Sequence, residues 1–187
     1  ISGKIDSNKS LLKINYQENI IQSNLSGDFQ FYNIMLSICI ANYFGIKTKN
    51  IVSAISEYIP KNNRSQIINK EKNKIILDAY NANPSSMKAS LESFKKNSEL
   101  NKICIIGDML ELGDYSDSEH KKIIGLVSKL NLKCYFVGSI FKSILGNNSF
   151  TSNKELINEI KENPIEGYTI FIKGSRGIKL EELVKYL

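Results

Sequence analysis

The sequence contains few of the residues that build disulfide frameworks and metal sites. Its 187 residues include no tryptophan, three prolines, one histidine and three cysteines. Cys39, Cys104 and Cys134 are far apart, and neither their odd number nor their spacing fits a disulfide framework or a zinc site. We therefore expect three buried free thiols and no metal-binding residue. His120 has no partner at ligand spacing and is predicted to lie on a helix surface.

Long apolar runs and blocks of like charge are also missing. No uninterrupted apolar stretch approaches the ~20 residues of a membrane span, and no basic and apolar leader opens the chain. The net charge of +6 comes from lysines scattered over every segment, without the interleaved aromatic residues of single-strand binding proteins. These absences favour a cytoplasmic protein without a membrane span or a nucleic-acid partner. Because it begins at Ile1 rather than Met, we take the chain for a fragment.

The motifs of several enzyme classes are absent as well. There is no G-x-x-x-x-G-K-[ST] phosphate loop, because Gly3-Lys4 is followed by Ile5 and lacks the upstream glycine. Nor is there a G-x-S-x-G nucleophile elbow or an H-E-x-x-H zinc motif. The chain therefore has no evident means of activating a nucleophile or of holding ATP by itself.

The pattern of apolar residues predicts a first part made of short strands and two helices. The strands are expected at residues 11–16 and 20–21. Residues 31–44 are apolar nearly all round and are followed by Gly45, which predicts a buried helix with a left-handed cap. A second helix is expected from Thr48 until Pro60 ends it. It places four apolar side chains on one face: Ile51, Val52, Ile55 and Ile59.

A polar stretch at residues 60–66 separates this part from a region of alternating strands and helices. We place the domain boundary there, with one domain at residues 1–62 and another at 63–187. Strands are expected at residues 67–68, 74–79, 103–106, 134–137 and 168–172. Helices are expected from Asn83-Pro84, from the capping boxes Ser116/Glu119 and Ser152/Glu155, and at residues 178–187. This alternation predicts an α/β fold: a Rossmann-like, mostly parallel sheet with flanking helices.

Three polar, glycine-rich segments follow apolar strands, at residues 78–84, 107–113 and 173–177. Because the carboxyl ends of parallel strands meet at one edge of a sheet, we expect these segments to converge there. Ligands bind at this edge in open α/β sheets, so it is the predicted position of the functional site.

Each segment has a functional and a purely structural interpretation. Asp78 suits a ribose hydroxyl, but the same turn could simply satisfy backbone groups before a helix. Asp108 and Glu111 suit a cation or an amine, or else an exposed acidic loop. Lys173 and Arg176 at a helix start favour an anion, the alternative being a glycine turn with solvent-facing cations.

Taken in order along the chain, these segments resemble those of the Mur ligase family, which builds the peptidoglycan precursor. The segments that carry the resemblance lie from Gly27 onward: the helix of Asn33, Asn63-Arg64-Ser65-Gln66, residues 78–89, residues 107–113, Glu119-His120 and residues 173–177. Each is a weak signal alone, but together, in the family's order, they are specific. Residues 80–81 and 107–113 point to the branch that joins D-alanyl-D-alanine to a UDP-N-acetylmuramoyl-tripeptide.

The resemblance implies a C-terminal Rossmann-like domain preceded by the tail of a central ATPase domain. It implies an ATP-dependent amide ligase, in which the tripeptide carboxylate becomes an acyl phosphate that the amine of D-alanyl-D-alanine attacks. The cofactors would be ATP and Mg²⁺, and the phosphate loop and most Mg²⁺ ligands would lie before Ile1. The fragment would be inactive alone, and the parent enzyme is expected to be a cytoplasmic monomer.

The resemblance also assigns candidate site residues. It places Asn33 near the adenine, Arg64 near the ATP phosphates and Asp78 near the ribose. Contacts with ATP are expected from Asn33, Arg64, Asp78 and Tyr80. Catalytic roles are expected for Arg64, Asn81, Asn83 and Lys173. Contacts with the substrates are expected from Asn83, Ser175 and Arg176.

The sequence departs from the family pattern at two places. Phe29-Gln30 stands where the family usually has His-Asn, and Leu77-Asp78 stands where it has two acids, so one carboxylate remains. Two alternatives stay open. The parent could be another Mur or folylpolyglutamate-type ligase, or the chain could be a nucleotide- or anion-binding module without catalysis.

Overall fold

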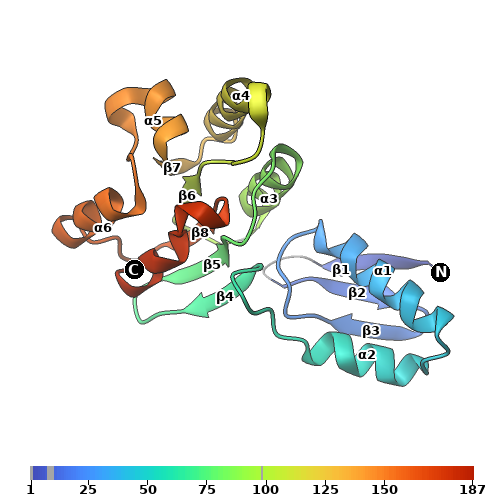
Figure 1. Ribbon diagram of the computed structural model, residues 1–187. Helices are drawn as coiled ribbons and strands as arrows, with labels where there is room; N and C mark the ends of the chain where they lie inside the picture. Colours follow the sequence, from blue (N-terminus) through green and yellow to red (C-terminus); the bar gives the residue numbers. More distant parts are fainter. Residues whose placement is uncertain (1, 8–10, 98) are drawn as a thin grey trace. The chain divides into compact units, whose positions relative to one another are not determined.

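The computed structural model describes residues 2–7, 11–97 and 99–187 (Figure 1). The chain divides into two compact units, one formed by Ile1–Pro60 with Lys96–Glu99 and the other by Lys61–Lys95 with Leu100–Leu187. None of the helices formed by the described residues has the length and apolar character needed to cross a bilayer. Each unit is described by itself.

The first unit combines a small antiparallel sheet with two helices. The sheet has the order β1-β2-β3, formed by β1 (Gly3–Ser7), β2 (Lys13–Tyr16) and β3 (Asn19–Gln22). The helices are α1 (Gln30–Tyr43) and α2 (Thr48–Glu57). Their apolar stripes pack on the strands in one core of seven buried residues: Leu12, Ile14, Tyr16, Ile21, Ile34, Ile38 and Ile51. The predicted strands and both helices of this part are therefore present.

Two details of these helices differ from the sequence expectation. Only Ile34 and Ile38 of α1 are buried, while Leu36 and Ile40 on its other face are exposed, so the prediction of a buried helix is wrong. The predicted left-handed cap at Gly45 is confirmed, with φ of 72°. α2 ends at Glu57 and leaves Ile59 exposed. A residue before proline disfavours the α conformation, which explains the early end ahead of Pro60.

The second unit is built on a five-stranded sheet of order β4-β5-β8-β6-β7. Its strands are β4 (Gln66–Asn69), β5 (Lys74–Asp78), β6 (Lys102–Gly107), β7 (Lys133–Val137) and β8 (Thr169–Lys173). Neighbouring strands run parallel, except that β4 pairs antiparallel with β5 at the edge. All five strands fall where the apolar runs predict them, and the fold is the expected mostly parallel sheet with flanking helices.

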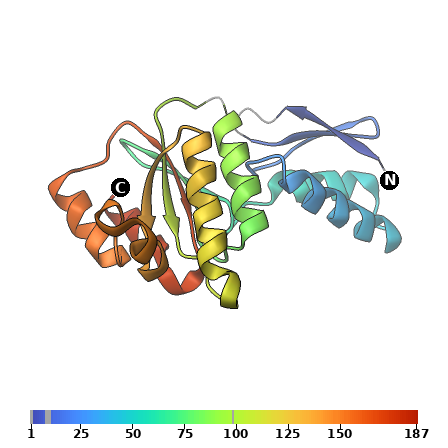
Figure 2. The same cartoon turned by 90° about the horizontal axis from the view of Figure 1, so that it is seen from above.

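Helices cover both faces of this sheet. On one face, α3 (Pro84–Lys96), α4 (Ser116–Lys129) and α5 (Ser139–Leu145) pack on side chains such as Ile76, Cys104 and Phe171. Figure 2 shows α3 and α4 running side by side. On the other face, α6 (Asn153–Glu162) and the 3₁₀ helix η4 (Leu180–Lys185) pack on residues including Ile105 and Ile172. The strands are apolar on both sides because both sides are covered.

The helix starts and the end of the chain test the local predictions. Asn83 accepts a hydrogen bond from Ser86 N (2.8 Å), and Ser152 accepts one from Glu155 N (3.4 Å), so both caps are confirmed. Ser116 does not cap α4, because the 3₁₀ helix η1 (Gly113–Tyr115) runs directly into it. Residues 178–187 do not form an α-helix. This stretch contains the end of η3 (Arg176–Ile178), then Lys179 with a left-handed φ of 57°, and then η4.

Candidate functional site

The ends of β5 and β8 are joined by a buried ion pair at the carboxyl edge of the sheet. Asp78 and Lys173 are register partners on these adjacent parallel strands. Lys173 Nζ lies 2.5 Å from Asp78 Oδ2 and 3.3 Å from the carbonyl oxygen of Asn81. The lysine side chain is only 3% exposed, so its charge is balanced locally rather than by solvent. Lys173 therefore orders the loop after β5.

The second oxygen of Asp78 holds the segment that leads into β4. Ser65 N donates a hydrogen bond to Asp78 Oδ1 at 3.1 Å. Asn62, Asn63 and Ser65 all have left-handed backbones, with φ of 58°, 60° and 49°. Asparagine tolerates this conformation better than other side chains, whereas serine needs support from its surroundings. The Asp78 carboxylate supplies part of that support and so fixes the position of Arg64.

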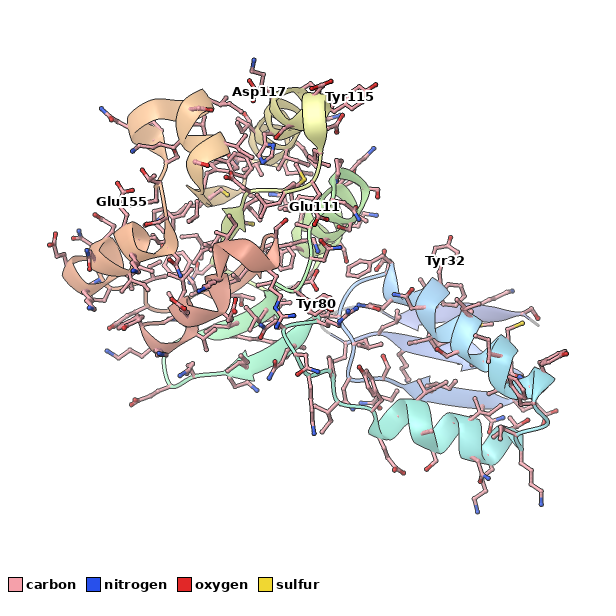
Figure 3. The ribbon with its side chains drawn as sticks, viewed as in Figure 1. Tyr32, Tyr80, Glu111, Tyr115, Asp117 and Glu155 are labelled. Carbon is pink, nitrogen blue, oxygen red and sulfur yellow. The ribbon has the colours of Figure 1, made fainter. Side chains whose placement is uncertain are left out.

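Arg64, Tyr80 and Arg176 form a cluster at the same edge. The guanidinium carbon of Arg64 lies 3.7 Å from the centroid of the Tyr80 ring, and that of Arg176 lies 5.7 Å from the same centroid. All three residues are exposed, and Tyr80, labelled in Figure 3, follows β5 by two residues. Neither guanidinium forms an ion pair with any residue that the structure describes. The cluster is a site of uncompensated positive charge.

Three further candidate residues, Asn81, Asn83 and Ser175, have polar groups that form hydrogen bonds within the fold. Asn83 Oδ1 caps α3, and the carbonyl of Asn81 accepts from Lys173. Ser175 is buried; its amide donates to Asp108 O at 3.0 Å, and its hydroxyl accepts from Leu110 N at 2.9 Å. These contacts tie together the segments after β5, β6 and β8. The expected convergence of the three segments is therefore found.

Asp108 has a structural role that the sequence interpretation missed. It is 1% exposed, and its carboxylate accepts hydrogen bonds from Ile140 N (2.9 Å) and Phe141 N (3.0 Å). It therefore caps the start of α5 and is not part of an exposed acidic loop. Among the described residues, Asp108 also belongs to no group of three or more His, Cys, Asp or Glu side chains that could hold a metal ion. Glu111, on the same loop, is exposed.

His120 is fully buried, so the prediction of a surface histidine is wrong. Its Nε2 accepts a hydrogen bond from Met109 N at 3.0 Å, which leaves Nδ1 as the protonated nitrogen, donating to Ser116 O at 2.7 Å. Both ring nitrogens are thus used in hydrogen bonds with the backbone. The signal was available in the sequence, because His120 lies three and seven residues before the core positions Ile123 and Val127 of α4.

Asn33 belongs to the other unit. It is exposed on α1, and its side-chain amide donates to Gln30 Oε1 at 2.9 Å. Gln30 lies at one of the two places that depart from the family pattern, and it orients the asparagine predicted to approach the adenine.

The three cysteines have different environments. Cys39 on α1 is exposed, which contradicts the expectation that all three thiols are buried. Cys104 is buried, and burial raises the pKa of its thiol to about 12. Cys134, its register partner on β7, is half-buried, and burial together with the neighbouring Cys104 raises the pKa of its thiol well above the usual value. All three are free thiols, as expected.

Comparisons with known proteins point to one family. The family model described as "Mur ligase, glutamate ligase domain" matches residues 63–176. The UDP-N-acetylmuramoyl-tripeptide–D-alanyl-D-alanine ligase of Bacillus subtilis is 32% identical over 188 residues, which covers 91% of this chain and 40% of that protein.

Solved structures show the same fold. A crystal structure of MurF from Acinetobacter baumannii superposes with a TM-score of 0.79 at 23% identity, covering 98% of this chain and 43% of that one. MurF ligase from Thermotoga maritima, solved in complex with ADP, superposes with a TM-score of 0.75 at 18% identity, covering all of this chain and 44% of that one. The chain thus spans about two fifths of the length of these relatives. It belongs to the Mur ligase family.

Proposed function

We propose that this chain is the C-terminal part of an ATP-dependent ligase that joins D-alanyl-D-alanine to UDP-N-acetylmuramoyl-tripeptide in peptidoglycan precursor synthesis. The observation that carries the proposal is the 32% identity to a ligase of that name over 91% of this chain. The proposal concerns the parent protein, because the chain spans 40% of that relative. We further propose that residues 1–62 complete the central ATPase domain and that residues 63–187 form the C-terminal domain.

The carboxyl edge of the second unit fits the ATP side of such a reaction. Arg64 and Arg176 offer two guanidiniums without an acidic partner in the described chain, and guanidinium forks match phosphate oxygens. Asp78 presents a carboxylate that is held in place by Lys173 and Ser65, which suits a ribose hydroxyl. ATP would supply the phosphoryl group that activates the tripeptide carboxylate. We assign nucleotide contacts in the second unit to Arg64, Asp78 and Tyr80. The adenine contact expected of Asn33, in the first unit, stays a separate prediction.

The same residues suggest how the acceptor amine is oriented. Lys173 holds the loop that carries Asn81 and Asn83, so both side-chain amides start from a fixed backbone. A fixed loop would orient the incoming amine and keep it close to the activated carboxylate. Ser175 directly precedes Arg176 and would position that arginine through its own hydrogen bonds with Asp108 and Leu110.

Magnesium would neutralise charge on the phosphates. Among the described residues, no group of three or more His, Cys, Asp or Glu side chains is placed to hold a metal ion. We therefore propose that Mg²⁺ is held mostly by residues of the parent protein that precede this chain. We also propose that the parent enzyme is a cytoplasmic monomer, which sedimentation would check.

The function can be tested on the intact protein, in which this chain is joined to its natural upstream sequence. We expect ATP-dependent amide formation with D-alanyl-D-alanine and not with diaminopimelate or glutamate, measured by mass spectrometry of the product. Replacing Arg64 by alanine should reduce kcat/KM by about 100-fold or more, as expected for loss of a charged group that stabilises the transition state.

The matched control is Lys129→Ala, which removes a cation from the last turn of α4 and should leave kcat/KM within about twofold of wild type. Amide formation with glutamate alone would instead indicate a folylpolyglutamate-type ligase. Nucleotide binding without any amide product would indicate a non-catalytic module. Normal turnover of Arg64→Ala would remove the role proposed for that residue.

A further inference from the structure

Two arginines from distant parts of the chain meet on one aromatic ring. Arg64 comes from the segment before β4, Arg176 from the turn after β8, and Tyr80 from the loop after β5. The guanidinium carbons lie 3.7 and 5.7 Å from the centroid of the ring. A cation on the face of an exposed aromatic ring is attracted by the negative charge of that face. The Tyr80 ring therefore favours a position for each guanidinium without fully neutralising either.

Nothing in the described part of the chain compensates these charges. The carboxylate that ends β5 at the same edge, Asp78, is already used by Lys173 through one oxygen and by Ser65 N through the other. Two like charges beside one ring repel each other, so the fold holds them together against their mutual repulsion. A bound anion would relieve that repulsion and contact both guanidiniums.

The geometry favours a phosphoryl group over a carboxylate. One guanidinium fork already engages both oxygens of a carboxylate through a bidentate pair. A terminal phosphoryl group has three oxygens in a tetrahedral arrangement, so it can accept from two forks that approach from different sides. Lys173 adds little here, because its charge is paired with Asp78.

We propose that Arg64 and Arg176 form a two-guanidinium clamp for a phosphoryl group and that Tyr80 is the positioning residue that holds both arms. The inference rests on the proposed function and deepens it, because it gives Arg176 a phosphoryl ligand and Tyr80 a role that requires no contact with the ligand. The ring face carries that role, and the phenolic hydroxyl is not needed.

The 187-residue chain can be tested directly with inorganic pyrophosphate as the probe. The Nε–Hε signals of the arginines are followed by ¹⁵N NMR at constant ionic strength. Arg64 is the only arginine besides Arg176, so the two signals are assigned by one substitution. Both signals should shift as pyrophosphate is added, with the same midpoint concentration of pyrophosphate. Arg64→Gln and Arg176→Gln should each raise Kd by about tenfold, as expected when a charge-assisted hydrogen bond is lost.

Variants of Tyr80 separate positioning from ligand contact. Tyr80→Phe keeps the ring face and should bind pyrophosphate within about twofold of wild type, whereas Tyr80→Leu removes the ring and should weaken binding by about fivefold or more. In Tyr80→Leu, the two arginine signals should also move toward the position of a free arginine before any pyrophosphate is added. Tyr80 is exposed, so neither variant threatens the core. Lys129→Gln makes the same charge change elsewhere and should have no effect beyond about twofold.

Several outcomes would overturn the clamp. Different midpoints for the two arginine signals would show two separate sites. Equal binding by Tyr80→Leu and wild type would remove the positioning role, and equal weakening by Lys129→Gln would show non-specific attraction. Shifts caused by D-alanyl-D-alanine and not by pyrophosphate would assign the arginines to a carboxylate. Because the ligase assay uses the intact protein and its amide product, failure of the clamp and failure of the proposed function are distinguishable.

Discussion

Among the glycines of the second unit, Gly138 has the least room for a side chain. Its φ of 129° and ψ of 162° lie in a region that is essentially restricted to glycine. A Cβ atom there would lie 2.3 Å from the carboxylate of Asp108, which accepts hydrogen bonds from the first amides of α5. A side chain at position 138 would therefore meet two obstacles, the strained backbone conformation and the clash with Asp108. Removing one of them would not remove the other.

Replacing Gly138 by alanine should lower the free energy of unfolding by about 3 kcal/mol or more, through backbone strain and displacement of Asp108. The matched control is Gly125→Ala in α4. A Cβ at Gly125 would have no neighbour within 4 Å, so this variant should be more stable by about 0.5–1 kcal/mol. Urea unfolding followed by far-UV circular dichroism measures both, since the chain has no tryptophan. Equal effects of the two changes would contradict this account.

Residue roles were predictable where local chemistry decides them. Asn83 caps α3 because asparagine before proline satisfies the first free amides of a helix, and both residues are adjacent in the sequence. The role of Asp108 was not predictable in this way, because its partners Ile140 and Phe141 lie more than thirty residues later. No local pattern distinguishes a carboxylate that caps a distant helix from one that faces solvent.

At the scale of elements, two lysine–carboxylate pairs link strands or loops that are far apart in sequence. Lys173 pairs with Asp78 at the carboxyl ends of β5 and β8, with side chains 3% and 16% exposed. Lys72 pairs with Glu166 in the loops before the same two strands, with side chains 57% and 50% exposed. The distances, 2.5 and 2.6 Å, are nearly equal, so burial is the main difference.

Replacing Lys173 by methionine should cost about 3 kcal/mol of stability, because it leaves the carboxylate of Asp78 without its partner in a largely buried site. Lys72→Met is the matched control and should change stability by less than about 1 kcal/mol, since an exposed pair is screened by solvent. Urea unfolding of both variants gives the two values. Similar losses would mean that burial does not determine the strength of these pairs.

Elements were predictable to the extent that their pattern is local. The short apolar runs of β6, β7 and β8 and the capping box of α6 locate these elements from sequence alone. The position of β8 between β5 and β6 depends on pairing across the whole unit and leaves no trace in any single segment. The exposed face of α1 was missed for the same reason, because the apolar sequence of a helix does not show how many of its faces are covered by other elements.

At the scale of the whole molecule, the reactivity of the thiols can be used to follow the unfolding of each unit separately. Cys39 is exposed in the first unit, whereas Cys104 lies in the core of the second. Burial raises the pKa of the Cys104 thiol from 9.0 to about 12, so it stays protonated and unreactive near neutral pH. The stability that comes from burying the neutral thiol is fully present below about pH 9 and is lost as pH rises toward 12.

Labelling with a thiol reagent at pH 8 should therefore modify Cys39 in the native protein, while Cys104 should react only as the second unit unfolds. Mass spectrometry of peptides gives the rate at each cysteine. Gly138→Ala should speed labelling of Cys104 and leave the rate at Cys39 unchanged, because Gly138 belongs to the second unit alone. Equal rates at Cys39 and Cys104 in the wild-type protein would contradict the assigned burial.

The order of strands in the second unit has a consequence for how the protein is made. β8 is the last of the five strands in chain order, yet it lies in the middle of the sheet, between β5 and β6. A ribosome would deliver β4 with β5, and later β6 with β7, as two ribbons that share no hydrogen-bonded edge. Each would present an open inner edge to other nascent chains until β8 emerges and joins them. The strand that closes the sheet is thus made after the two ribbons that it joins.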